Sequence, residues 1–181
     1  MLHAMIDLET LDVRPEAVVL SIGIALFNPN NPAEPPKPAY YGVLDKTTQI
    51  ESGRTTSQST VDWWAQQSPE ARTVLAEVQR PVIGVLKDVA GKIDWNQIGG
   101  VWGNGASFDN AMLKSLFAQW SMDLPWDFWK DRCHRTMKAV FETRYGKSNF
   151  PREGTHHNAL DDAMHQAREL QHMLHHLGIK L

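Results

Sequence analysis

The sequence predicts an α/β domain built on a mixed sheet, and three observations lead to this fold class. An apolar run over 2–8 and a second one over 18–27, rich in β-branched residues, lie close together near the N-terminus, which favours an antiparallel strand pair. Helical spacing of apolar residues begins near residue 59 and returns through the rest of the chain. A short apolar segment, 98–102, interrupts these helices and ends at a glycine, as a further strand would.

Proline, glycine and apolar spacing mark the remaining boundaries of the first two thirds. Five prolines in residues 28–38 predict a surface loop, and Pro69 suits the first turn of a helix. In chain order, the elements expected after this loop are a strand 39–44, a turn-like polar segment 47–57, a helix 59–67 capped by Ser59 or Thr60, a helix from Ser68, a helix 82–93, the strand 98–102 and a helix 107–120.

The last third predicts a strand followed by two helices. Residues 127–145 alternate aromatic and basic side chains, which we interpret as strand then helix, and residues 146–157 form a loop. A final helix is expected over 159–176, with Asn158 as its N-cap and Asp161 three residues later, as in a capping box.

Length and composition exclude several classes of protein. The chain has 181 residues, 42% of them hydrophobic, and a formal net charge of −3, so we expect one folded domain over residues 1–181 and no disordered chain. The longest apolar run, 18–27, is about half of the roughly 20 residues that cross a bilayer. A single Cys133 excludes an internal disulfide and a thiolate zinc cluster, and the acidic N-terminus lacks a secretory signal, so we expect a cytoplasmic setting.

A basic segment stands out within an acidic chain. Residues 130–152 hold 7 Lys or Arg against 2 Asp or Glu, whereas residues 1–129 hold 9 against 15. Two interpretations remain open at this point: a solvated helix and loop, or a surface that faces phosphate groups.

Two acids close the first predicted strand. Asp7 and Glu9 are two residues apart, so strand alternation places both carboxylates on one face. Partly buried, such a pair needs a cation, and oxygen ligands suit Mg²⁺ or Mn²⁺; fully solvated, it is an ordinary strand end. Asp109 at the start of the 107–120 helix has the same two interpretations, because acids are also favoured there by the helix dipole, and Asn104 fits a simple turn.

The final helix adds a further acid and a histidine. On a helical wheel the apolar residues of 159–177 define one buried face; Asp162 lies at its flank, whereas Asp161 lies nearly opposite. Asp162 can therefore reach an interior cleft. His157, just before the cap, is free to lie over the same cleft and could act as a general base near neutral pH.

Together these residues resemble the three motifs of the DEDDh 3′-to-5′ exonucleases over nearly the whole chain. The motifs read Asp7-x-Glu9, Asn104-x-x-x-Phe108-Asp109 and His157-x-x-x-x-Asp162. The Trp63-Trp64 pair and the small size look like the single-domain branch of phages and bacteria, which includes exoribonucleases. The resemblance implies a ribonuclease H-like fold, with a mixed five-stranded sheet flanked by helices.

The resemblance also implies a chemistry. Asp7, Glu9 and Asp162 would hold one divalent ion, Mg²⁺ or Mn²⁺, and Asp7 would share a second ion supported by Asp109. His157 would take the proton of the attacking water, and the product would be a nucleoside 5′-monophosphate. The expected substrates are 3′ ends of single-stranded RNA or DNA, with a slight preference for RNA.

Substrate contacts follow less directly from the motifs. Thr10 and Leu11 are expected at the terminal nucleotide, although MIDLETLDVRP lacks the Thr-Gly continuation that some relatives have. Asn104 is also expected to contact the substrate. Trp63, Trp64 or Phe108 could stack on a base, and the alternative for Phe108 and one of the tryptophans is packing in the core.

Two alternative functions remain open at this point. One is a catalytically silent nucleic-acid-binding module of the same fold, and the other is a metal-dependent phosphatase acting on small phosphoesters. The sequence also leaves the oligomeric state open, a homo-oligomer included.

Overall fold

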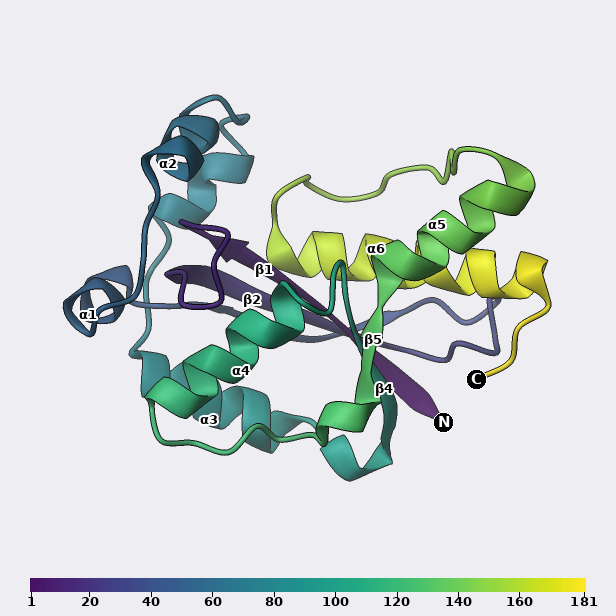
Figure 1. The fold of residues 1–181 in the computed structure, drawn as a ribbon, viewed down its shortest axis with the longest axis horizontal. Coiled ribbons are helices and arrows are strands. Elements are labelled where there is room, and N and C mark those ends of the chain that lie inside the picture. Colours follow the sequence, from purple (N-terminus) through teal and green to yellow (C-terminus); the bar gives the residue numbers. More distant parts are fainter.

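The computed structural model describes residues 1–181 and contains a five-stranded sheet in the order β3-β2-β1-β4-β5 (Figure 1). The strands are β1 (Leu2–Thr10), β2 (Val19–Phe27), β3 (Lys37–Val43), β4 (Ile98–Gly103) and β5 (Asp131–Cys133). The strand β2 pairs antiparallel with both β1 and β3, whereas β4 runs parallel to β1 and β5 parallel to β4. The mixed five-stranded sheet expected from the sequence is therefore present.

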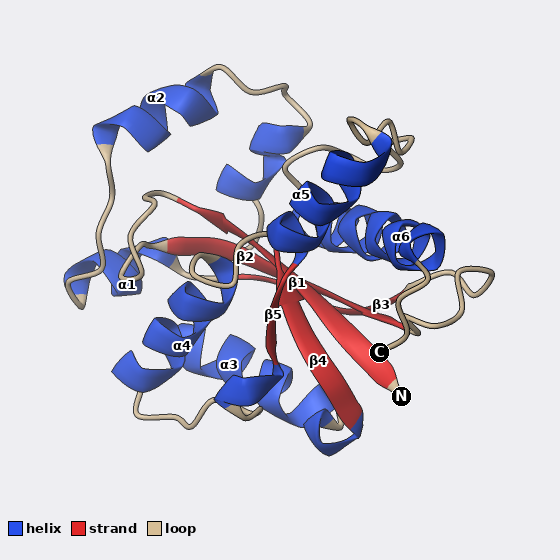
Figure 2. Ribbon diagram, turned by 45° about the vertical axis from the view of Figure 1, so that its right-hand side comes forward, coloured by secondary structure: helices blue, strands red, loops and turns tan.

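Helices cover both faces of this sheet (Figure 2). Two of them, α3 and α4, lie on one face, and α5 and α6 lie on the other, while α1 and α2 lie beyond the end of β1. The α-helices are α1 (Lys46–Glu51), α2 (Gln58–Ala65), α3 (Val82–Lys92), α4 (Asp109–Gln119), α5 (His134–Tyr145) and α6 (Ala159–Leu177); short 3-10 helices span Ala71–Leu75, Trp95–Gln97 and Phe128–Lys130. None of the helices has the length and hydropathy that a membrane span requires.

The alternation of β1 separates two hydrophobic cores. Ala4, Ile6 and Leu8 pack in a core with side chains of α3 and α4, whereas Met5 packs in a second core with α6. Residues of odd number in β1 therefore point toward α6. Beyond Met5, the next two odd positions are the acids at 7 and 9, which places both of them on the α6 side of the sheet.

The helix α1 falls in a segment that the sequence predicts to be turn-like, so this prediction is wrong. Asp45 caps the helix by accepting hydrogen bonds from the backbone N–H groups of Thr47 and Thr48. Its buried residue is Gln49, whose amide donates to and accepts from the backbone of Val19. The helix α1 buries a polar side chain instead of a row of apolar ones. The spacing of apolar residues therefore does not predict a helix here.

Three other boundaries differ from prediction. The N-cap of α2 is Ser57 rather than Ser59 or Thr60, and its hydroxyl accepts from the Thr60 N–H group. The helix expected from Ser68 is the short 3-10 helix Ala71–Leu75. At α6, Asn158 is confirmed as N-cap, but the capping box is incomplete because the Asp161 carboxylate accepts from the Thr155 N–H group instead.

Candidate active site

A polar cavity of about 500 Å³ opens where β1 ends beside α5 and α6. Leu8 is the only hydrophobic residue among the 14 that line it. The lining includes the acids Asp7, Glu9, Asp162 and Glu169 and the basic residues Arg135, Lys138 and Arg152. A cavity with this composition suits a charged, hydrated ligand rather than an apolar one.

The two acids of β1 are buried in the floor of the cavity. Asp7 is 9% exposed and Glu9 is 6% exposed, and both project toward α6 as the strand alternation requires. The amide of Gln166 on α6 donates a hydrogen bond of 2.7 Å to Oδ1 of Asp7. This bond leaves the second carboxylate oxygen of Asp7 available to another partner.

Asp109 begins α4, directly after the turn that follows β4, and lies behind the cavity rather than in its lining. Its Oδ1 atom accepts a hydrogen bond of 3.3 Å from the Leu8 N–H group, and its Oδ2 atom is buried without a partner. A Cβ atom on Gly103 would lie 3.0 Å from Oδ2, so the glycine allows the end of β4 to approach this carboxylate. A buried polar atom without a partner is rare in proteins, and a bound cation would satisfy this one.

Asp162 reaches the cavity from the first turn of α6. Its Oδ2 atom accepts a hydrogen bond of 2.9 Å from the His157 N–H group, and its Oδ1 atom forms an ion pair with Arg152. The close approach of α6 to β2 depends on Gly23, because a Cβ atom there would lie 2.2 Å from the carbonyl group of Ala159. Because Gly23 pairs with Asp7 across the strands, the glycine brings Asp162 close to Asp7.

Burial and mutual repulsion perturb three of these acids. Burial, followed by the charges of Asp109, Glu9 and Asp162, raises the pKa of Asp7 well above its usual value. Burial also raises the pKa of Glu9 to about 8 and that of Asp109 to about 7. The nearby arginines therefore do not offset the burial and mutual repulsion of these acids, and divalent cations are the partners that clustered carboxylate oxygens fit best.

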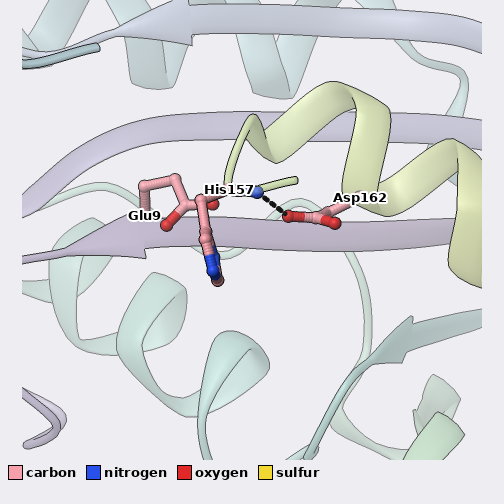
Figure 3. Close-up of side chains that lie close together, drawn as sticks. All are labelled: Glu9, His157 and Asp162. Atoms are coloured by element: carbon pink, nitrogen blue, oxygen red, sulfur yellow. Dashed lines mark hydrogen bonds between the residues drawn. The ribbon is translucent and has the colours of Figure 1, made fainter. Parts of the chain in front are cut away.

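His157 lies beside this cluster. Ligand atoms of Glu9, His157 and Asp162 lie within 4.8 Å of one another, and Figure 3 shows Glu9 and Asp162 on either side of His157. Burial, followed by the charge of His156, lowers the pKa of His157, so its imidazole is mostly neutral at pH 7. Its backbone adopts φ of 64°, and the Trp63 ring lies edge-on at 4.7 Å between centroids.

Three of the residues predicted to contact substrate are used for structure. Thr10 is buried, and its hydroxyl donates to the carbonyl oxygen of Asp12. Trp64 is 2% exposed and donates from its indole to the Thr10 carbonyl oxygen, so its burial contradicts the stacking role predicted for it. Leu11 packs against the small hydrophobic cluster that contains Trp64. The exposed member of the tryptophan pair is Trp63, at 40%.

The other two predicted contacts divide between cavity and core. Asn104 lines the cavity, and its backbone carbonyl accepts a hydrogen bond of 2.8 Å from Arg135. Phe108 is half-buried, packs against the core beneath α4 and does not line the cavity. Its aromatic ring therefore stabilises the turn that carries Asp109.

The structure adds residues that sequence reasoning missed. Gln166 and Glu169 follow Asp162 on the same face of α6, at positions i+4 and i+7, and this helical spacing was the available signal. Although burial opposes ionisation of Glu169, hydrogen bonds from His134, Lys138 and Ser148 lower its pKa below the usual value. Glu169 is therefore satisfied by protein donors and joins α5 to α6.

Comparison with known proteins agrees with this geometry. The family profile described as 3′-5′ exoribonuclease Rv2179c-like domain matches residues 2–174. No curated protein matches the chain.

Two solved nucleases share the fold at low sequence identity. One is cell-death related nuclease 4 (CRN-4), with a TM-score of 0.65 and 13% identity over 97% of this chain; the chain spans 64% of that nuclease. The other is the nuclease domain of 3′hExo, a DEDDh family member bound to rAMP, with a TM-score of 0.58 and 15% identity over 97% of this chain and 92% of that one. The expected ribonuclease H-like fold is confirmed. The chain belongs to the family of 3′-5′ exoribonuclease Rv2179c-like domains, which confirms the predicted resemblance to DEDDh exonucleases.

Proposed function

We propose that this chain is a divalent-metal-dependent 3′-to-5′ exonuclease that acts on single-stranded nucleic acid ends and prefers RNA to DNA. The observation that carries the proposal is the meeting of four buried carboxyl groups, from β1, α4 and α6, beside one imidazole. The family description, which names an exoribonuclease, supports RNA as the preferred substrate.

The four acids fit two Mg²⁺ or Mn²⁺ ions. Asp7, Glu9 and Asp162 would hold one ion, and Asp109 would support a second ion shared with Asp7. The buried, unpartnered Oδ2 atom of Asp109 and the raised pKa values of the β1 acids support this fit. When bound, such ions stabilise the negative charge that develops on the nonbridging and departing oxygens during phosphodiester hydrolysis.

His157 would act as the general base. A mostly neutral imidazole can accept the proton of the attacking water at neutral pH, and its Nδ1 or Nε2 atom lies within 4.8 Å of ligand oxygens of Glu9 and Asp162. Attack by water at phosphorus would release a nucleoside 5′-monophosphate. Trp63, exposed beside His157, offers a ring on which the terminal base can stack.

The basic segment 130–152 divides in a way that supports binding of a polyanion. Arg135, Lys138 and Arg152 line the cavity, where their charge would offset the repulsion between the acids and a phosphate backbone. Lys130 instead donates to the Trp95 carbonyl oxygen, before β4, and Arg132 donates to the Trp129 carbonyl oxygen, before β5. The part of the segment that lines the cavity therefore supports the phosphate-facing interpretation.

The test uses a matched pair of RNA and DNA oligonucleotides of one sequence, labelled at the 5′ end, with Mg²⁺ or Mn²⁺. We expect stepwise shortening from the 3′ end, faster for RNA, and release of 5′-monophosphates. Asp7→Ala should abolish the metal-dependent turnover, and Asp123→Ala, an exposed acid outside the cavity, should not. Strand binding without nucleotide release would show a binding module, and hydrolysis of nucleoside monophosphates with inert oligonucleotides would show a phosphatase; either result contradicts the proposal.

A further inference from the structure

One cation already lies at the carboxylate cluster. Arg152, in the loop between α5 and α6, forms an ion pair through Nη1 with Oδ1 of Asp162. This is the only ion pair that any of the four clustered acids makes with a basic side chain. The Asp162 side chain is 9% exposed and that of Arg152 is 30% exposed, so the guanidinium group covers the carboxylate from the cavity side.

This contact conflicts with the binding of a metal ion. The His157 N–H group takes one acceptor position of Oδ2 of Asp162, and the Arg152 guanidinium group faces Oδ1, so a cation that approaches through Oδ1 meets Arg152. A guanidinium group and a divalent ion cannot both approach this oxygen at short range, because their charges repel. Loading of the site therefore requires the Arg152 side chain to leave Asp162.

The loop that carries Arg152 is anchored independently of this contact. Asp161 accepts a hydrogen bond of 2.7 Å from the Thr155 N–H group, and Glu153 forms an ion pair with Arg168 on α6. The Arg152 side chain has one other bond, from Nη2 to the Thr155 carbonyl oxygen. The backbone can therefore stay in place while the side chain moves within the cavity.

A released guanidinium group at this position needs an anion. The substrate that fits the cavity supplies one, since guanidinium groups bind the nonbridging oxygens of phosphate through two parallel hydrogen bonds. We propose that Arg152 exchanges between two anions: it neutralises Asp162 in the metal-free site, and it binds the terminal phosphodiester of the substrate once the metal site is filled. This inference rests on the proposed nuclease function. It adds a substrate-binding residue that also neutralises Asp162 when no metal ion is bound.

The first measurement is the affinity for Mn²⁺ without any oligonucleotide, by calorimetric titration of Arg152→Gln and wild type. We expect Arg152→Gln to bind Mn²⁺ roughly tenfold more tightly, because the competing ion pair is gone. Arg135→Gln is the matched control: Arg135 lines the same cavity but donates to the Asn104 carbonyl oxygen. It removes the same charge without removing a competitor, so its effect should be clearly smaller.

The second measurement is the steady-state kinetics of RNA degradation at saturating Mn²⁺. We expect the KM of Arg152→Gln to rise roughly tenfold, the usual effect of losing a charge-assisted phosphate contact. Arg152→Lys keeps the charge but not the fork of donors, so its Mn²⁺ affinity should stay near that of wild type while its KM rises severalfold. Thermal unfolding in EDTA checks that each variant is folded.

Three outcomes would overturn the inference. Mn²⁺ affinity that is unchanged or weaker in Arg152→Gln rules out competition for Asp162, and so does an equal gain in Arg135→Gln. Tighter Mn²⁺ binding with unchanged KM rules out transfer of the guanidinium group to the substrate. Failure of the proposed function is distinguishable, because it would show as a wild-type protein that degrades neither RNA nor DNA while the Mn²⁺ titrations can still be compared.

Discussion

Replacing Glu9 by glutamine should stabilise the metal-free protein. Burial, followed by the charges of Asp162 and Asp109, raises the pKa of Glu9 from 4.5 to about 8 on folding. Between these pH values the unfolded chain has released the proton and the folded chain still holds it, so stability falls as the pH rises. The resulting loss of unfolding free energy is on the order of 3 kcal/mol at pH 7 and less than about 1 kcal/mol at pH 5. A neutral glutamine at this position would not cause this loss.

Thermal unfolding in EDTA at pH 5 and pH 7 measures this effect. In a chain of this size each kcal/mol shifts the midpoint by about 2–4 °C, so Glu9→Gln should unfold roughly 6–12 °C above wild type at pH 7 and by little at pH 5. Glu51→Gln, on the exposed side of α1, is the matched control and should show no such gain. Mn²⁺ at a hundredfold excess over its Kd should stabilise wild type by about 2.7 kcal/mol, and Glu9→Gln by much less.

Two results would refute the reasoning. A Glu9→Gln midpoint at or below that of wild type at pH 7 would show that the carboxyl group is not a destabilising charge in the folded chain. A gain of the same size at both pH values would show that the cause is packing rather than ionisation.

Three further predictions concern other parts of the molecule. His157→Ala should lower kcat by about 10² to 10⁴, the usual contribution of a positioned base, and a near-normal rate in single-turnover assays would remove His157 from that role. Gly23→Ala places a methyl group 2.2 Å from the backbone of α6, so it should lower the free energy of unfolding by about 1–3 kcal/mol and reduce the rise in unfolding midpoint that Mn²⁺ causes. Gly84→Ala is the control, because a Cβ atom there has no neighbour within 4 Å. Equal unfolding midpoints for the two variants would contradict the prediction. Burial, with Arg132 second, lowers the pKa of His3 to about 4, so the unfolded chain takes up the proton first and stability falls between pH 6.5 and about 4. Urea unfolding in EDTA should show that the unfolding free energy of His3→Gln rises relative to that of wild type from pH 7 to pH 5, because the variant lacks this histidine. A difference that is the same at both pH values would contradict this assignment.

Local sequence patterns predict the parts of the site that depend on one element at a time. Strand alternation places Asp7 and Glu9 on one face, and the wheel of α6 separates Asp162 from Asp161, because both rules depend only on backbone geometry. The Asn158 cap follows from the same local logic, since its side chain bonds N–H groups two and three residues away.

The parts that the sequence does not predict depend on contacts between distant segments. Gly23 in an apolar strand reads as a weak position in a sheet, and only the fold shows that α6 lies against it. Trp64 and Trp63 are neighbours of one residue type, and the packing of α2 decides that one is buried and the other exposed. Arg152 is one of seven Lys or Arg residues in the segment 130–152, and only the path of the loop shows that it is the one that pairs with Asp162.

Gly23 and Gly103 have a consequence for how this centre could change over evolution. Neither carries a chemical group, yet one sets how near Asp162 lies to β1 and the other sets how near Asp109 lies to β4. The spacing of the proposed metal ligands therefore depends on two positions that have no Cβ atom. Because Mg²⁺ demands shorter, stricter coordination than larger divalent ions, we expect ion preference to shift through small changes at these two spacers while every ligand stays the same.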